Sequence, residues 1–235
     1  MLSLGSLGGD VHYAFSSRLD GFSAPPYDSL NLSDAVGDDP GAVERNQQLV
    51  LGRVVLESAA WLRARHGSEV RVVDGPELVE ADGLVSITPG LALGGLSADC
   101  ALVVLADAGA GVVGVAHCGR LGLVGGVVAS AVDAMRDAGA RALRAAVGPT
   151  VCGSCYEVPA EMAAAVTAVV PAASARSRSG GAGLDIRAGV IAQLAGAGVR
   201  AVRQVGGCTV EDPTMFSYRR DGVTGRMGAL VWRAA

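Results

Sequence analysis

Residues 98–117 read ADCALVVLADAGAGVVGVAH. Two short apolar runs, Ala101–Ala106 and Gly111–Ala116, flank a loop, a pattern typical of a buried β-hairpin. If the strands pair about the central bond of that loop, Cys100 faces His117. Directly opposed residues of antiparallel strands have Cα atoms about 4.5 to 5.5 Å apart. The hairpin therefore predicts a thiol and an imidazole close enough to hold one metal ion or share one proton.

Strand-like and helix-like segments alternate along the rest of the chain, with no low-complexity linker. Helices are expected from Pro40 after Asp38-Asp39, along Leu123–Met135, after Pro159 and after Asp185. Strands are expected at Ala59–Arg65 and Glu69–Val73, joined by a turn at His66-Gly67-Ser68, and at Ala142–Val147 and Val199–Val205. We therefore expect an α/β fold in which residues 1–235 form a single domain, with mixed, partly antiparallel sheets and flanking helices.

Composition excludes several functional classes. The net charge of -4, without a basic cluster, argues against a nucleic-acid partner. All 19 basic residues are arginine, so no lysine is present to form a Schiff base or complete a phosphate-binding P-loop. No segment has the length of a membrane span or the pattern of a signal peptide, so we expect a cytoplasmic protein without a membrane partner. In that compartment the five cysteines are expected to be unpaired.

Two of the three histidines, His66 and His117, fall beside glycine or at an expected strand end, where their side chains can converge with that of Cys100. A thiolate and two imidazoles suit Zn²⁺, and three protein ligands leave a fourth position for water or substrate. The same set also describes a blue-copper site, so copper is the alternative metal. The less specific interpretation is a buried thiol beside hydrogen-bonded histidines. We expect the third histidine, His12, to be an ordinary strand residue.

Several short motifs occur in a characteristic order. In chain order these are Phe15-Ser16, Tyr27, Ser29-Leu30-Asn31-Leu32, Gly37-Asp38, His66-Gly67, Ala98-Asp99-Cys100, Val113–His117, Gly148-Pro149, Tyr156-Glu157-Val158, Cys208-Thr209, Phe216–Asp221 and Thr224-Gly225-Arg226. Together they resemble the laccase-domain (YfiH-type) family, whose members are called multicopper polyphenol oxidoreductases and also purine nucleoside phosphorylases. The likeness covers essentially the whole chain.

The resemblance implies a single α/β domain and a His-Cys-His metal site formed by His66, Cys100 and His117, which would also be the catalytic residues. It implies phosphorolysis of adenosine, inosine and, as a further candidate, methylthioadenosine, together with some adenosine deamination. The partners would then be a purine nucleoside and phosphate, and the protein a monomer or a small homo-oligomer. In the family pattern an arginine follows the second metal histidine one position later than Arg120 does here, and Gln47 replaces an arginine.

Candidate substrate-binding residues come from the same motifs. Arg120, Arg219 and Arg220 are candidates for phosphate, because a guanidinium group suits phosphate oxygens. Phe216 is a candidate for stacking on the purine, and Asn31 is a further candidate contact. Asp99 could move protons, although its position in the pleat directs it away from Cys100. Cys152 and Cys155 have the CxxC spacing of redox and metal half-sites, and a structural zinc site would need Cys208 or Cys118 as well.

Three rival functions remain open at this point. A copper-dependent polyphenol oxidase would fit the older family name, but dioxygen reduction by a multicopper oxidase needs more histidines than this chain has. A metal-free cysteine hydrolase would use Cys100 as nucleophile and His117 as base. A non-catalytic metal-binding module would keep the three ligands and need no arginine-lined pocket. Metal content and product analysis with inosine and phosphate distinguish these possibilities.

Overall fold

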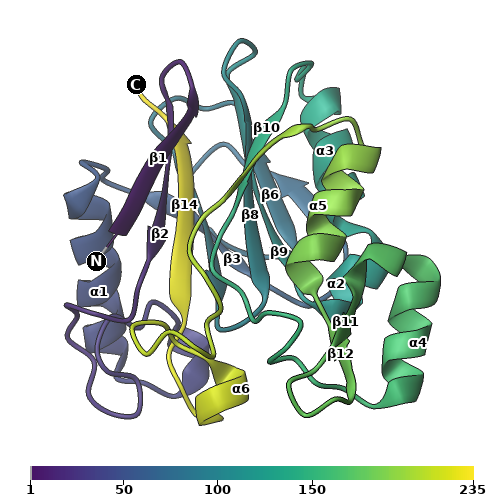
Figure 1. Cartoon of the computed structure of the whole chain (residues 1–235). Coiled ribbons are helices and arrows are strands. Elements are labelled where there is room, and N and C mark those ends of the chain that lie inside the picture. The colour runs from purple at the N-terminus through teal and green to yellow at the C-terminus, as the bar shows by residue number, and fades with distance from the viewer. Residues whose placement is uncertain (1) are drawn as a thin grey trace.

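The computed structural model describes residues 2–235, and Figure 1 labels its elements. The strands are β1 (Leu2–Gly8), β2 (Val11–Ser16), β3 (Ala59–Arg63), β4 (Val70–Val72), β5 (Leu78–Glu80), β6 (Gly83–Ser86), β7 (Ala92–Ser97), β8 (Ala101–Asp107), β9 (Val112–Cys118), β10 (Arg144–Val147), β11 (Ser174–Arg176), β12 (Ala182–Leu184), β13 (Ala201–Gln204) and β14 (Met227–Arg233). The helices are α1 (Pro40–Arg53), α2 (Arg120–Gly125), α3 (Val127–Asp137), α4 (Ala160–Val169), α5 (Ile186–Gly196) and α6 (Tyr218–Asp221).

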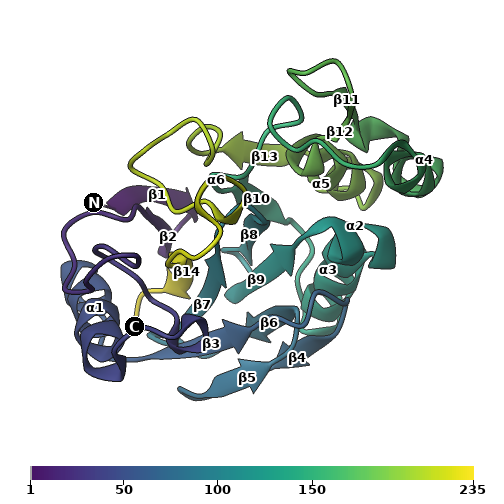
Figure 2. The ribbon, with the colours of Figure 1, turned by 90° about the horizontal axis from the view of Figure 1, so that it is seen from below.

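Two six-stranded sheets pack face to face (Figure 2). One has the order β1-β2-β14-β7-β3-β5 and is covered by α1. The other has the order β13-β10-β8-β9-β6-β4 and is covered by α2, α3 and α5, while α4 packs outside these helices against α2 and β12. Each sheet combines parallel pairs, such as β3 with β7 and β10 with β13, with antiparallel ones. The expected α/β fold with partly antiparallel sheets and flanking helices is therefore confirmed.

The continuous apolar runs of the central hairpin follow from this layering. In β8, Leu102 and Val104 point into the core between the sheets, whereas Val103 and Leu105 point toward the helices. Both faces of the strand are thus removed from water, so apolar residues are needed at every position. The sequence pattern correctly indicated a strand of this kind.

The register of the hairpin differs from the prediction by two residues. Leu102, not Cys100, pairs with His117, because β8 extends through Asp107 and the loop is 108–111. The Asp107 carboxylate accepts hydrogen bonds from the backbone N–H groups of Gly109 and Ala110, at 3.0 and 3.1 Å, and so stabilises the turn. Because side chains alternate with a period of two, a shift of two residues keeps the Cys100 and His117 positions on the same face.

Asp107 is expected to be important for stability. Its other carboxylate oxygen accepts the N–H groups of Arg141 and Ala142 at 2.6 and 2.7 Å. The hydrogen bond from Ala142 is the largest cause of a lowered Asp107 pKa; burial opposes the shift, and the bonds from Arg141, Ala110 and Gly109 support it. Asp107→Asn would present an amide N–H to two donors, so we expect it to lower the free energy of unfolding at pH 7 by about 2 to 4 kcal/mol.

The pH dependence of this effect has a definite sign. A carboxyl group whose pKa is lowered by folding stabilises the protein above its unfolded pKa of about 3.9, and that contribution is lost as the pH falls through the folded value. Urea unfolding of wild type and Asp107→Asn should therefore give curves that differ most at neutral pH and converge in acid. Equal stabilities at pH 7 would contradict the assignment.

Two other expectations are corrected by the structure. The strands on either side of His66 do not form a hairpin: β3 belongs to one sheet and β4 to the other, so the segment between them crosses the sandwich. The helix expected along Leu123–Met135 is divided into α2 and α3 at Gly126, which has a left-handed φ of 80°. The helix starts at Pro40, Pro159 and Asp185 are confirmed within a residue. Among the described helices, none is long and apolar enough to cross a membrane.

Candidate metal centre

His66, Cys100 and His117 come from different parts of the fold and meet at one point. His66 lies on the segment between β3 and β4 with a φ of 62°, Cys100 immediately precedes β8, and His117 lies in β9. One ligand atom from each lies within 4.8 Å of the other two. The two imidazole rings are nearly perpendicular, with centroids 4.8 Å apart. The structure thus brings together the three residues that the sequence indicated as metal ligands.

Asp82 connects the two histidine-bearing segments. Its backbone carbonyl accepts the His117 N–H at 2.8 Å, and its carboxylate accepts the Arg65 N–H at 2.9 Å. The side chain is 1% exposed and packs beside Gly67, where an added Cβ would lie 3.0 Å from the carboxylate. Asp82 therefore fixes the position of His117 and of the chain beside His66. Nothing in the neighbouring sequence marks this aspartate as buried, so its role is visible only in the structure.

Gly119 leaves one side of the centre free of a side chain. A Cβ at this position would lie 2.8 Å from the Cys100 sulfur and 3.3 Å from Cδ2 of His66. The buried Nδ1 of His117 has no hydrogen-bond partner among the described residues. An unpartnered nitrogen, a thiol and a second imidazole around a space that even a methyl group would fill are a donor set that fits Zn²⁺ or copper.

Burial governs the protonation of the two inner ligand residues in the metal-free protein. It raises the pKa of Cys100 to about 12, with a further rise from the Asp99 carboxylate and an opposing effect of Arg226. Burial, followed by repulsion from His66 and Arg226, lowers the pKa of His117 to about 3. His117 is therefore neutral at pH 7, the form that can bind a metal, whereas the Cys100 thiol without a metal keeps its proton.

Asp99 is directed away from the metal centre. Its carboxylate accepts the Thr209 hydroxyl at 2.5 Å and the Arg219 N–H at 2.6 Å, and its backbone carbonyl accepts the Val151 N–H at 3.0 Å. The residue has a φ of 91°, a left-handed conformation. Asp99 thus joins three segments around Cys100, and this geometry favours a positioning role over the proton-transfer role considered from the sequence.

Two cavities flank Cys100. One, of about 410 Å³, is lined by residues that include His66, His117, Arg63 and Arg226. The other, of about 370 Å³, lies on the side of Arg120 and Arg219. Ala98, Cys100 and Tyr218 line both. The candidate metal centre therefore lies where two ligand-sized spaces meet.

Three of the residues expected to bind substrate have side chains that are buried or held by other parts of the chain. Phe216 is fully buried, with the Arg18 guanidinium 5.0 Å from its ring centroid, so its face is unavailable to a purine. The guanidinium of Arg220 donates to four backbone carbonyls and to the carboxylate of Asp221, which leaves no donor directed at a ligand. The third, Asn31, is also fully buried.

The Asn31 side chain connects two segments of the chain by hydrogen bonds: its own, and the one that carries Arg226 into the cavity beside His66. Its amide donates to the Ser33 carbonyl and the Asp38 carboxylate, each at 2.9 Å, and its oxygen accepts the Arg226 N–H at 2.8 Å. Asn31 therefore positions Arg226, which the sequence analysis quoted in a motif without assigning a role. Burial is the largest influence on Arg226 and lowers its pKa, while attraction to Cys100 and Asp99 opposes that shift.

Arg120 and Arg219 do line a cavity, as their candidate role requires. Arg120 begins α2 and makes no side-chain hydrogen bond or ion pair with the described residues. Arg219 donates to the Glu157 carbonyl and lies over the Tyr156 ring, 5.0 Å from its centroid. Tyr156 and the exposed Tyr218 are therefore the aromatic residues at this cavity, in place of Phe216.

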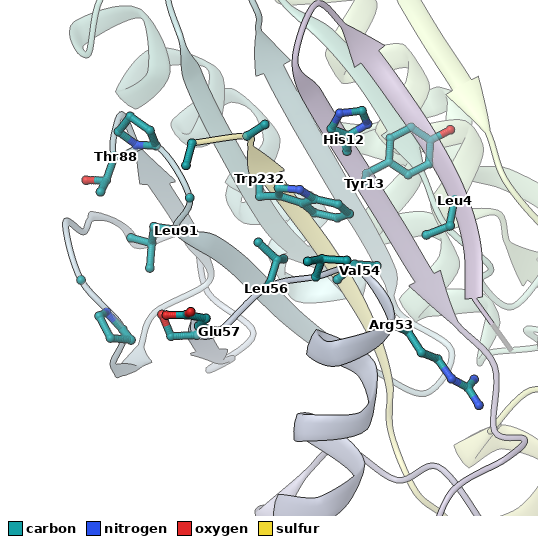
Figure 3. Close-up of a pocket in the computed structure, with 18 of the residues that line it drawn as sticks. Leu4, His12, Tyr13, Arg53, Val54, Leu56, Glu57, Thr88, Leu91 and Trp232 are labelled. Carbon is teal, nitrogen blue, oxygen red and sulfur yellow. The ribbon is translucent and has the colours of Figure 1, made fainter.

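A further pocket, of about 950 Å³, lies elsewhere (Figure 3). Trp232 stands between Leu56 and His12 in this pocket, and none of the lining residues is shared with the cavities at Cys100. His12 belongs to β2, as expected for an ordinary strand histidine. A single histidine without a thiol nearby gives this pocket no comparable set of metal ligands.

The family model described as multi-copper polyphenol oxidoreductase laccase matches residues 12–234. A Streptomyces griseus protein named purine nucleoside phosphorylase is 48% identical over 233 residues, which cover 95% of each chain. The YfiH protein of Shigella flexneri, with the same enzyme name, is 36% identical over 92% of this chain and 91% of its own.

Solved structures of similar proteins superpose on this chain over nearly its whole length. A Neisseria meningitidis protein of 32% identity superposes with a TM-score of 0.87 over 100% of this chain and 99% of its own. Bacillus licheniformis YfiH, 26% identical, has a TM-score of 0.87 over 95% of this chain and 92% of its own.

Proposed function

The chain belongs to the multi-copper polyphenol oxidoreductase laccase family, and we propose that it is a purine nucleoside phosphorylase whose active site is the centre at Cys100. Relatives that share up to 48% of their residues over nearly the whole chain carry that enzyme name. The observation that carries the proposal is the meeting of two cavities at the Cys100 centre, one of them bordered by Arg120 and Arg219.

The two cavities suit the two substrates. Phosphate would occupy the cavity of Arg120 and Arg219, because guanidinium groups pair well with phosphate oxygens. The purine nucleoside would enter from the cavity beside His66 and Arg226. Tyr218 borders both spaces and is 62% exposed, so its ring could lie against the base or the sugar.

His66, Cys100 and His117 would hold one Zn²⁺ ion, with copper as the alternative metal. When bound, such an ion supplies a Lewis acid with an open position for water or substrate. The local residues favour this use of the centre. His117 is neutral, its buried Nδ1 has no hydrogen-bond partner in the described part of the chain, and Gly119 puts no side chain beside the Cys100 sulfur.

The residues of the chain would contribute mainly by positioning and charge. Phosphorolysis breaks the bond between the sugar and the purine through a cation-like sugar, while negative charge grows on the base. Arg120 and Arg219 would hold phosphate for attack on the sugar carbon, and the half-buried Arg226 would stabilise the departing base. Asp99 would hold the adjacent Cys100 and the backbone of Arg219 in fixed positions relative to each other through its buried hydrogen bonds.

We propose adenosine deamination as a second activity of the same centre. An ion held by His66, Cys100 and His117 would supply the Lewis acid that hydrolytic release of ammonia from adenosine needs. The reaction requires no phosphate, so it is separable from phosphorolysis by its co-substrate.

Product analysis tests both proposals. With inosine and phosphate, purified protein should release hypoxanthine and ribose 1-phosphate, and no base should form without phosphate. With adenosine and no phosphate, ammonia and inosine should appear. If no purine nucleoside yields base in the presence of phosphate, the phosphorylase proposal is wrong.

Two rival functions fit the centre less well. A metal-free cysteine hydrolase needs a thiolate, yet burial raises the pKa of Cys100 to about 12. A multicopper oxidase needs a histidine-rich cluster besides the first copper, and the chain contains only three histidines. His12, the one histidine outside the centre, lines a different pocket.

A further inference from the structure

A second cluster of metal-ligating side chains lies outside the proposed active site. Cys152, Cys155, Cys208 and Glu211 each offer a ligand atom, and these four atoms all lie within 4.8 Å of one another. All five cysteines of the chain are free thiols. None of these four residues lines either cavity at Cys100.

The sheet topology explains how the two halves of the cluster meet. Cys152 and Cys155 follow β10, whereas Cys208 and Glu211 follow β13, and these two strands are parallel neighbours. The carboxyl ends of parallel neighbours emerge side by side, and a bridge between Thr150 and Cys208 extends the pairing beyond the strands. Each half has the same i, i+3 spacing, which is a recurring spacing of paired zinc ligands.

Local hydrogen bonds fold both halves toward a common centre. The Cys152 N–H donates to the Cys208 sulfur at 3.3 Å. The Cys155 and Tyr156 N–H groups both donate to the Cys152 carbonyl, at 3.0 and 2.9 Å, which bends the CxxC segment into a turn. The Cys155 thiol donates to the Glu211 carboxylate at 3.6 Å. The CxxC therefore lies in a turn and not at a helix start, so the geometry of a thioredoxin-type redox site is absent from this segment.

Two arginines offset the negative charge that bound thiolates would bring. Arg178 forms an ion pair with Glu211. Arg187 donates to the carbonyls of Gly148 and Gly207, at 2.9 and 3.1 Å, and so lies between the two loops that carry the thiols. Three thiolates and one carboxylate around a divalent cation would carry two net negative charges, which these two guanidinium groups balance.

We propose that Cys152, Cys155, Cys208 and Glu211 form a second metal site, which binds one Zn²⁺ ion in tetrahedral coordination and joins the loop after β10 to the loop after β13. Zinc–sulfur bonds of about 2.3 Å place the sulfurs of a tetrahedral site about 3.8 Å apart, so only a small contraction of the cluster is needed. Three mutually close thiols favour a metal over a disulfide, because a disulfide would leave one of them unpaired. With four protein ligands and no open position, the site would be structural.

Two residues next to this cluster also contact the cavity lined by Arg120 and Arg219 or its neighbours. Thr209 follows Cys208 directly and donates to Asp99, while Tyr156 follows Cys155 and lines the cavity. An ion at the second site would therefore hold both flanking segments in place. The site itself rests on the cluster geometry and is independent of the proposed phosphorylase activity.

The test uses full-length protein in which the first centre is removed by His66→Ala and His117→Ala. After removal of metal and re-addition of Zn²⁺ or Co²⁺ alone, this double variant should bind one ion per chain, and Co²⁺ should give an intense near-ultraviolet thiolate-to-metal absorption. Adding Cys208→Ser should abolish both signals. Adding Cys118→Ser, which removes a buried thiol outside the cluster, should leave them unchanged.

A second measurement needs no substitution at the cluster. In wild-type protein, Zn²⁺ should slow alkylation of Cys152, Cys155 and Cys208 together, as followed by peptide mass spectrometry. The proposal is overturned if the double variant binds no metal, if Zn²⁺ gives these thiols no protection, or if freshly purified protein contains a disulfide among them.

Discussion

Cys100→Ala and His117→Ala are each expected to abolish most of the phosphorolysis of inosine and to remove the metal of the first centre. A Cys100 thiolate would be the soft ligand that secures Zn²⁺, and His117 is a buried imidazole whose Nδ1 has no partner within residues 2–235. Loss of an outer residue that merely orients a ligand typically costs about 10- to 100-fold in metal affinity or activity, so loss of a ligand should exceed this. The effect should appear in kcat far more than in KM, because groups that act on the transition state are lost from kcat.

Cys118→Ala is the matched control for this experiment. It removes a neighbouring thiol that is fully buried among the helix-side core residues and belongs to neither group of candidate ligands among the described residues. It should keep the metal of the first centre and the wild-type kcat.

Gly119→Ala tests the same centre without removing any of its three candidate ligands. The added Cβ would lie 2.8 Å from the Cys100 sulfur, so we expect both the metal content and kcat to fall. A fully active Cys100→Ala variant would refute the mechanism.

The parts of the fold that the sequence predicted well are those set by local rules. Asp39 accepts the Ala42 N–H at 2.9 Å and begins α1 beside Pro40, as the cap pattern indicates. The apolar runs of β8 and β9 identified a strand pair buried on both faces. The register was not predictable in the same way, because it depends on hydrogen bonds from Arg141 and Ala142 that fix Asp107 in the strand instead of the loop.

The three candidate metal ligands could be identified from the sequence for a similar reason, whereas most of the residues around them could not. Histidine and cysteine are rare in this chain, so their type and position carry information even when the pairing is shifted by two residues. Arginine is abundant, and whether one faces a ligand depends on long-range contacts. Arg220 is fixed by the carbonyls of residues 209–215, whereas Arg120 has no such partners among the described residues. Phe216 is likewise removed from the site by burial against Gly225.

Arg120→Ala is expected to raise the KM for phosphate by about 10- to 100-fold, because a hydrogen bond to a charged group contributes about 1.5 to 3 kcal/mol and each 1.4 kcal/mol is about tenfold. The KM for inosine should change little. Arg120 makes no side-chain hydrogen bond or ion pair with the described residues, so this variant should fold normally. Initial-rate measurements with each substrate varied in turn give both constants.

The comparison that makes this result specific is Arg203→Ala, which removes an exposed arginine from the edge strand β13, away from either cavity. It lowers the net charge by the same amount, so a general loss of attraction for anions would affect both variants alike. An effect confined to Arg120→Ala would instead require a local phosphate contact. A parallel rise in the KM for inosine would indicate that Arg120 contacts the nucleoside. If neither KM changes, Arg120 does not bind phosphate, and Arg219, the other arginine of that cavity, becomes the candidate.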